Sequence, residues 1–101
     1  LPASAPSRAA DAVCRRFADA ALTNHSVRSY LWAARYAADN GLRYDADVLY
    51  VAAMVHDLGL TATFDAYRTP FEMVGGELGW VLGVGAGWSS ERAQRVTDIA
   101  T

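Results

Sequence analysis

The chain contains 101 residues, of which 52% are hydrophobic and 20% are charged, and its formal net charge is −2. This composition is typical of one globular domain with a modest core. The apolar runs are far shorter than the roughly 18 residues that span a bilayer, so no membrane segment is expected. All nine basic residues are arginines, scattered from Arg8 to Arg95 without a basic stripe, which argues against nucleic-acid binding.

Rare and absent residue types exclude further classes of protein. The chain has no lysine, which excludes a lysine-dependent phosphate-binding loop and a Schiff-base mechanism. Its single cysteine, Cys14, excludes an intrachain disulfide and fits a reducing compartment, so we expect a cytoplasmic protein. The arginine-only, alanine-rich composition suggests a GC-rich bacterial genome.

Apolar residues recur at helical spacing along nearly the whole chain, and no stretch alternates with the period of a strand. The sequence therefore predicts an all-α fold, a compact bundle of about five helices. We expect helices at about residues 7–22, 23–40, 47–58, 70–82 and from 90 to the end. These helices would form one domain over residues 1–101, and an end inside the fifth helix predicts that this domain is partial.

Capping residues indicate where four of these helices begin or end. Gly41 is predicted to stop the second helix in a left-handed conformation, and Gly59 is predicted to stop the third. Asp45 would cap the third helix, which is apolar almost all round and must be central. The sequence Thr69-Pro70-Phe71-Glu72 predicts a strong start for the fourth helix, and Ser89 or Ser90 would cap the fifth.

The only two histidines are His25 and His56, and the second is followed directly by Asp57. Two imidazoles and one carboxylate are a ligand set for a divalent metal ion. Adjacent helical residues point about 100° apart, so His56 and Asp57 can share an ion only where their helix is ending. His25 lies near the start of the preceding helix, which a short link joins to the third. The sequence therefore predicts that the three side chains converge on one metal.

This pattern of a histidine followed by a His-Asp pair resembles the HD-domain superfamily of metal-dependent hydrolases. Residues 24–30, 49–60 and 71–76 look like the cyanamide hydratase type of that superfamily, and the resemblance covers about residues 24–101. It implies an HD-like helical fold.

The resemblance also implies which residues bind the metal. Matching the motif residue by residue gives His25, His56 and Asp57 as ligands, and the superfamily's final aspartate would lie beyond residue 101. Asp98 is not expected to be that fourth ligand, because the segment around it looks like a helix that precedes a further histidine.

Other residues are candidates for catalysis and substrate binding. Three protein ligands leave room for a water that iron(II), manganese or zinc can activate for attack on an electrophilic carbon or phosphorus. Asp57 would then be catalytic as both ligand and proton acceptor. Glu72 is a candidate proton shuttle, although a capping box explains it fully.

The substrate-binding candidates are Arg28 and Thr61. Arg28 lies three residues after His25 on the same helical face, but a solvated charge or a salt bridge explains it equally well. Thr61 and Asp65 lie on the loop after the His-Asp pair, where substrate contacts are common.

The leading hypothesis is an enzyme that adds water to a small molecule, such as the nitrile-like compound cyanamide. An HD-type phosphohydrolase of a nucleotide or phosphate ester is the second hypothesis. A non-catalytic helical module that binds a partner or acts as a sensor is the third. We expect a small-molecule substrate and no nucleic-acid or membrane partner, with a homo-oligomer as an open possibility.

Overall fold

The computed structural model describes residues 1–61, 63–64 and 71–100, which form five α-helices and one short 3₁₀ helix and contain no strand. The predicted all-α class is therefore confirmed. None of the described helices is both long and apolar enough to cross a membrane. In chain order the elements are α1 (Ala5–Phe17), α2 (Ala20–Asp39), α3 (Ala46–Val55), η1 (Leu58–Leu60), α4 (Phe71–Gly85) and α5 (Ser90–Ala100).

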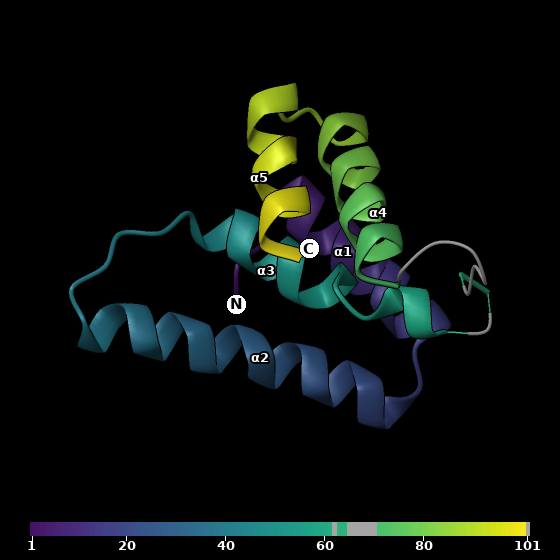
Figure 1. Ribbon diagram of the computed structural model, residues 1–101, viewed down its shortest axis with the longest axis horizontal. Coiled ribbons are helices and arrows are strands. Elements are labelled where there is room, and N and C mark those ends of the chain that lie inside the picture. The colour runs from purple at the N-terminus through teal and green to yellow at the C-terminus, as the bar shows by residue number, and fades with distance from the viewer. Residues whose placement is uncertain (62, 65–70, 101) are drawn as a thin grey trace.

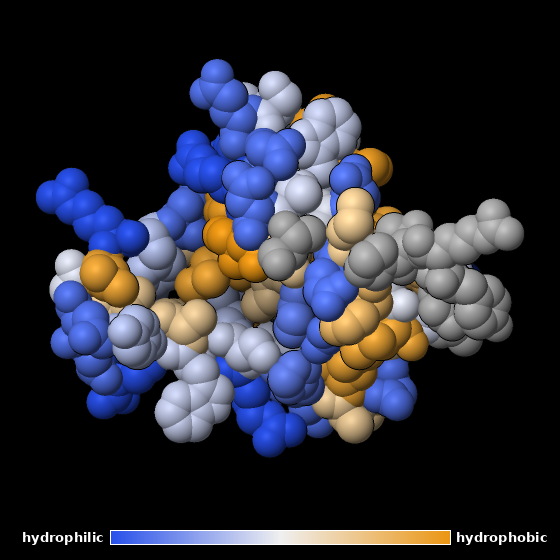
Figure 2. Space-filling view, in the orientation of Figure 1, coloured by the Kyte–Doolittle hydropathy of each residue, from blue (hydrophilic) through white to orange (hydrophobic). Residues whose placement is uncertain are grey.

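Helix α3 is the centre of the fold. Seven of its ten residues are buried, and it contacts all four other α-helices. Figure 1 shows α2 running along one side of α3, while α4 and α5 stand side by side on another. In the same orientation, some apolar surface is visible between α2 and α5, among more polar side chains (Figure 2). A helix that is apolar all round is stable only when neighbours cover every face, which explains why α3 is central.

The boundary between α1 and α2 differs from the prediction. The first helix ends at Phe17 rather than near residue 22, and the second begins at Ala20. Asp19 caps α2, because its carboxylate accepts a hydrogen bond of 2.7 Å from the backbone N–H of Leu22. Apolar spacing continues across this break, so periodicity alone did not reveal it. As a result, His25 lies in the second turn of α2.

Gly41 follows α2 with a φ of 64°, which confirms the predicted left-handed stop. The predicted role of Gly59 is wrong, because α3 already ends at Val55 and Gly59 lies in η1 without a positive φ. A Cβ atom at Gly59 would meet the backbone of Phe71. A glycine is therefore needed at this position for close approach of the start of α4.

Helix α4, the first of the two C-terminal helices, is longer than predicted. Helix α4 extends to Gly85 rather than to about residue 82, and the predicted cap at residues 69–70 lies outside the described residues. Ser89 precedes α5 and its hydroxyl accepts a hydrogen bond of 3.2 Å from the backbone N–H of Arg92. This contact confirms the predicted serine cap.

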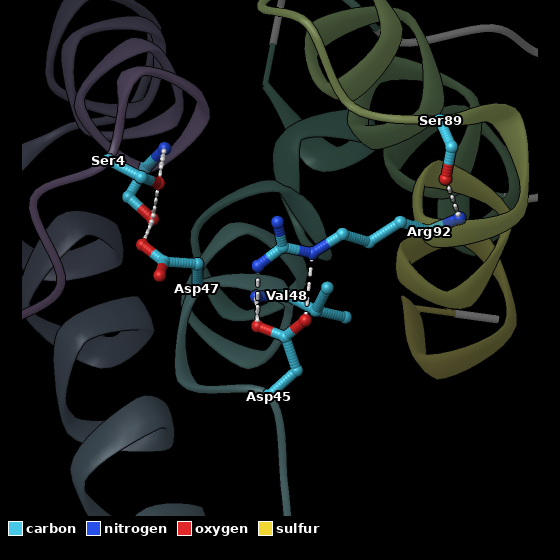
Figure 3. Close-up of polar contacts among 7 residues, drawn as sticks. Ser4, Asp45, Asp47, Val48, Ser89 and Arg92 are labelled. Atoms are coloured by element: carbon cyan, nitrogen blue, oxygen red, sulfur yellow. Dashed lines mark hydrogen bonds and ion pairs between the residues drawn. The ribbon is translucent and has the colours of Figure 1, made fainter.

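Polar contacts connect the start of α3 to its neighbours (Figure 3). Asp45 caps α3 by accepting a hydrogen bond from the N–H of Val48, and it also accepts two from Arg92 of α5, at 2.8 and 3.0 Å. Asp47 accepts a 2.7 Å hydrogen bond from the hydroxyl of Ser7 on α1. Hydrogen bonding to Arg92 lowers the pKa of Asp45, and hydrogen bonding to Ser4 and Ser7 lowers that of Asp47. Ionisation of these carboxylates therefore strengthens the contacts of α1 and α5 with α3.

The lowered pKa values predict that the protein loses stability in acid. Each of the two carboxyl groups has a lower pKa in the folded state than in the unfolded state. Its contribution to the free energy of unfolding is therefore fully present above the unfolded-state pKa of about 4, and it is lost as the pH falls through the folded-state pKa. We expect Asp45→Asn to reduce the free energy of unfolding at about pH 7 by about 1–2 kcal/mol. Below about pH 5, the free energy of unfolding of the variant should also fall less steeply with pH than that of the wild-type chain.

Urea unfolding followed by circular dichroism at several pH values measures both effects. Asp39→Asn is the matched control, because Asp39 forms an ion pair with Arg35 within the exposed face of α2. That control should change the free energy of unfolding by less than about 0.5 kcal/mol. Equal effects of the two substitutions would contradict the prediction.

Candidate metal centre

The three predicted ligands lie together at the end of α3. The Nε2 atom of His25 is 3.1 Å from Oδ2 of Asp57, and the Nε2 atom of His56 is 2.9 Å from the same oxygen. The centroids of the two imidazole rings are 5.6 Å apart. Two nitrogen atoms from different helices therefore face one carboxylate oxygen.

The end of α3 allows neighbouring residues to point toward one place. His56 is the C-cap of α3 and still has helical dihedral angles, with φ −58° and ψ −32°. Asp57 has left the helical region, with φ −105° and ψ 8°, and η1 begins at the next residue. The two side chains are therefore not held at the roughly 100° separation that a continuing helix would impose.

A backbone contact fixes the orientation of the His56 ring. Its Nδ1 atom lies 2.5 Å from the carbonyl oxygen of Ala53. A carbonyl oxygen can only accept a hydrogen bond, so Nδ1 must carry the proton. In the neutral imidazole this places the free lone pair on Nε2, the atom that faces Asp57. Metal-binding histidines commonly use such a contact to set their tautomer.

The resulting electrostatics favour a cation between the three side chains. A lone pair on Nε2 of His56 and a carboxylate oxygen of Asp57 at 2.9 Å repel each other unless a positive charge lies between them. The side chain of Asp57 is only 14% exposed, so water screens this repulsion weakly. Either a proton or a metal ion can supply the positive charge.

The spacing of the donor atoms fits a divalent ion. One ligand atom from each residue can be chosen so that all three lie within 4.8 Å of one another. Nitrogen and oxygen ligands lie about 2.0–2.2 Å from zinc, so two ligands at the tetrahedral angle are about 3.4 Å apart. The two nitrogen–oxygen distances, 3.1 and 2.9 Å, are a few tenths of an ångström shorter than this value. The side chain of His25 is 56% exposed, which leaves one side of the site open to solvent.

Helix α4 packs directly behind the His-Asp pair, a feature that the sequence analysis missed. A Cβ atom at Gly75 would meet the carbonyl oxygen of Val55 and would lie 2.8 Å from that of His56. The absence of a side chain at Gly75 therefore lets α4 lie against the backbone that carries two of the three ligands. Small residues in α4 were visible in the sequence, but only the structure identifies which of them contacts this backbone.

The predicted substrate-binding residues are Arg28, three residues after His25 on α2, and Thr61, which directly follows η1. Arg28 is exposed on α2, and its Nε donates a hydrogen bond of 3.4 Å to the carbonyl oxygen of Asn24. Thr61 is buried and its hydroxyl donates a hydrogen bond of 2.6 Å to the carbonyl oxygen of Leu58. This contact closes η1, so the hydroxyl hydrogen of Thr61 is already used. The role of each residue toward a substrate stays a prediction.

The remaining candidates lie on α4, the loop and α5. Glu72 is half-buried in the first turn of α4, three residues before Gly75 and thus on the same helical face. Its proposed capping partner, Thr69, lies outside the described residues, as does the loop candidate Asp65. Asp98 accepts a hydrogen bond of 3.1 Å from Gln94 on the exposed face of α5 and is absent from the cluster of possible metal ligands.

Comparison with protein families agrees with the all-α fold. The family model described as "HD domain" matches residues 22–79, more than half of the chain. The chain therefore belongs to the HD-domain family, whose members are generally metal-dependent hydrolases that bind divalent metal ions. The matched segment contains His25, His56 and Asp57. Searches of curated proteins and of solved structures found no match.

The contact at Gly75 predicts that this residue positions the metal ligands. Gly75→Ala should push α4 away from the carbonyls of Val55 and His56 and displace the His-Asp pair. We expect metal affinity to fall about 10- to 100-fold, the usual cost of disturbing the groups behind the ligands. Competition with a chromogenic chelator measures this affinity.

Gly79→Ala is the matched control on the same helix. Its new methyl group would meet the side chains of Val96 and Val55 rather than the backbone of the ligands. Both variants should lose about 1–3 kcal/mol of folding stability through overpacking, measured by urea unfolding of the metal-free chain. Only Gly75→Ala should also weaken metal binding, and an equal loss of affinity in the two variants would refute a positioning role.

Proposed function

We propose that this chain carries the metal centre of a hydratase that adds water to a nitrile-like small molecule, such as cyanamide, to give an amide or urea. The observation that carries the proposal is the approach of two imidazole Nε2 atoms to one oxygen of Asp57, at 3.1 and 2.9 Å. Membership of the HD-domain family supports the hydrolytic class of this chemistry.

In this proposal His25, His56 and Asp57 hold one divalent ion, with iron, manganese and zinc all compatible with the ligands. When bound, the ion supplies Lewis acidity, which lowers the pKa of a coordinated water and polarises the substrate. The contact of His56 with the carbonyl of Ala53 keeps the ring oriented and its Nε2 free. The second oxygen of Asp57 is a candidate proton acceptor, and Glu72 is a candidate shuttle on the neighbouring helix.

The distribution of charge favours an uncharged substrate over a polyanionic one. Three arginines already have carboxylate partners in other parts of the fold: Arg15 with Asp11, Arg35 with Asp39 and Arg92 with Asp45. Tight binding of phosphate esters usually requires several converging cations. Arg28 is the nearest candidate along the sequence, and its position on exposed α2 provides at most one such group.

The proposed ligand set predicts the outcome of metal analysis. The purified chain should contain close to one transition-metal ion, and His56→Ala should lose it while retaining its helical circular dichroism spectrum. Removing one of three protein ligands abolishes most of the binding free energy. Asp98→Asn is the control, because this exposed carboxylate lies outside the cluster and its loss should leave the metal content unchanged. Full metal content in His56→Ala would overturn the assignment.

The proposed reaction predicts that the metal-loaded chain releases urea from cyanamide. Urea production should fall at least about 100-fold in His25→Ala and His56→Ala, because the water is no longer activated. Phosphate release from a panel of nucleotides, assayed with the same metal-loaded protein, should stay at the background rate. Phosphate release without urea would instead establish the second hypothesis, an HD-type phosphohydrolase.

A further inference from the structure

A small pocket adjoins the candidate metal centre. Its volume is about 190 Å³, and His56 forms part of its wall. The same residue therefore belongs to both the metal-ligand cluster and the pocket. One substrate molecule can therefore place a substituent in the pocket, beside His56, while its reacting atom lies at the metal centre.

The pocket lies between α2 and α3 because short side chains face each other there. Helix α2 contributes Ser29 and Ala33, which follow His25 at intervals of four residues and so continue its helical stripe. Helix α3 contributes Ala52 and Ala53 on the turn before His56. Short side chains at these positions leave the space open.

Larger apolar side chains line the other end of the pocket, which stays open to solvent. Leu49 lies one turn before Ala52 and Ala53 on α3, Ile99 reaches the pocket from the end of α5, and the short side chain of Ala100 lies beside it. Figure 2 shows apolar surface gathered between α2 and α5 on this face of the molecule. The pocket is therefore formed by three helices, with the metal ligand His56 among its lining residues.

The polar groups of the wall are already hydrogen-bonded. The hydroxyl of Ser29 donates to the carbonyl oxygen of His25 at 2.8 Å, and Nδ1 of His56 contacts the carbonyl oxygen of Ala53. No residue that lines the pocket is an aspartate, glutamate or arginine. The wall therefore offers a charged or strongly polar group few hydrogen-bond partners in place of the water that it displaces.

We propose that this pocket binds an apolar substituent of the substrate, so that the preferred substrate is a nitrile or cyanamide bearing an aliphatic group of about four to six carbons. A cavity of about 150 Å³ lined by aliphatic side chains is large enough for benzene, and the present pocket is slightly larger. An unsubstituted cyanamide would leave this space unfilled. The inference rests on the proposed function, because it places the reacting group at the metal centre.

Two probes of different chain length test the proposal by binding rather than by turnover. We expect pentanenitrile to bind the zinc-loaded chain about 10- to 50-fold more tightly than acetonitrile, because it buries three more methylene groups at about 0.8 kcal/mol each. Titrations followed by nuclear magnetic resonance measure both dissociation constants. The signals of the His56 ring and of the Ala33, Ala52 and Ala53 methyl groups should shift.

A pair of variants on α2 locates the binding site. Ala33→Leu should fill the pocket and reduce the preference for pentanenitrile to less than about threefold, since the methylene groups then remain in water. Ala38→Leu is the matched control, because Ala38 lies on the same helix but is exposed and outside the pocket. It should retain the full preference. Zinc stoichiometry should be unchanged in both variants.

The results separate a failure of this inference from a failure of the proposed function. If the wild-type chain binds zinc but shows no preference for pentanenitrile over acetonitrile, the proposed role of the pocket is wrong, while the proposed metal site is retained. The same conclusion follows if Ala33→Leu keeps the preference. If the chain binds no metal but pentanenitrile still shifts the alanine methyl signals, the pocket stands and the proposed function fails.

Discussion

The site depends on the fact that α3 stops being helical where its sequence becomes polar. Val55 is the last helical residue, and the following His56 and Asp57 differ in backbone conformation so that both can face His25. A longer α3 would turn one of the pair away. The rest of the fold holds this helix end in place. Most of the apolar residues of α3 are buried, and Gly75 of α4 packs against the carbonyl groups of its last turn.

The two ends of α3 are held by different interactions. At its start, ionised Asp45 and Asp47 bind groups on α5 and α1, so charge and hydrogen bonding fix the helix. At its end, the carbonyl oxygens of Val55 and His56 lie in close backbone packing against α4 at Gly75.

Apolar periodicity was sufficient to predict five helices and the central position of α3, since a segment such as residues 48–55 has no polar face to expose. The pairing of His25 with His56 and Asp57 was also expected from their placement near neighbouring helix ends. Periodicity could not predict the break at Asp19, because apolar spacing continues through it and a local hydrogen bond to Leu22 decides the boundary. The role of Gly59 was misread for a related reason: its lack of a side chain serves contact with Phe71, which is distant in sequence.

In the proposals made above, reactivity and substrate selection depend on different residues of the same two helices. His25 and His56 supply nitrogen atoms at one end of a groove, while Ser29, Ala33 and Leu49 shape the space beyond them. Because the ligand geometry depends on the backbone turn at the end of α3, a substitution at Ala33 or Leu49 alters the pocket without moving that turn. Substrate preference can therefore change through wall residues while the metal centre stays intact. The small volume of the pocket makes it sensitive to single methyl groups, since each one added or removed is a large fraction of the space available.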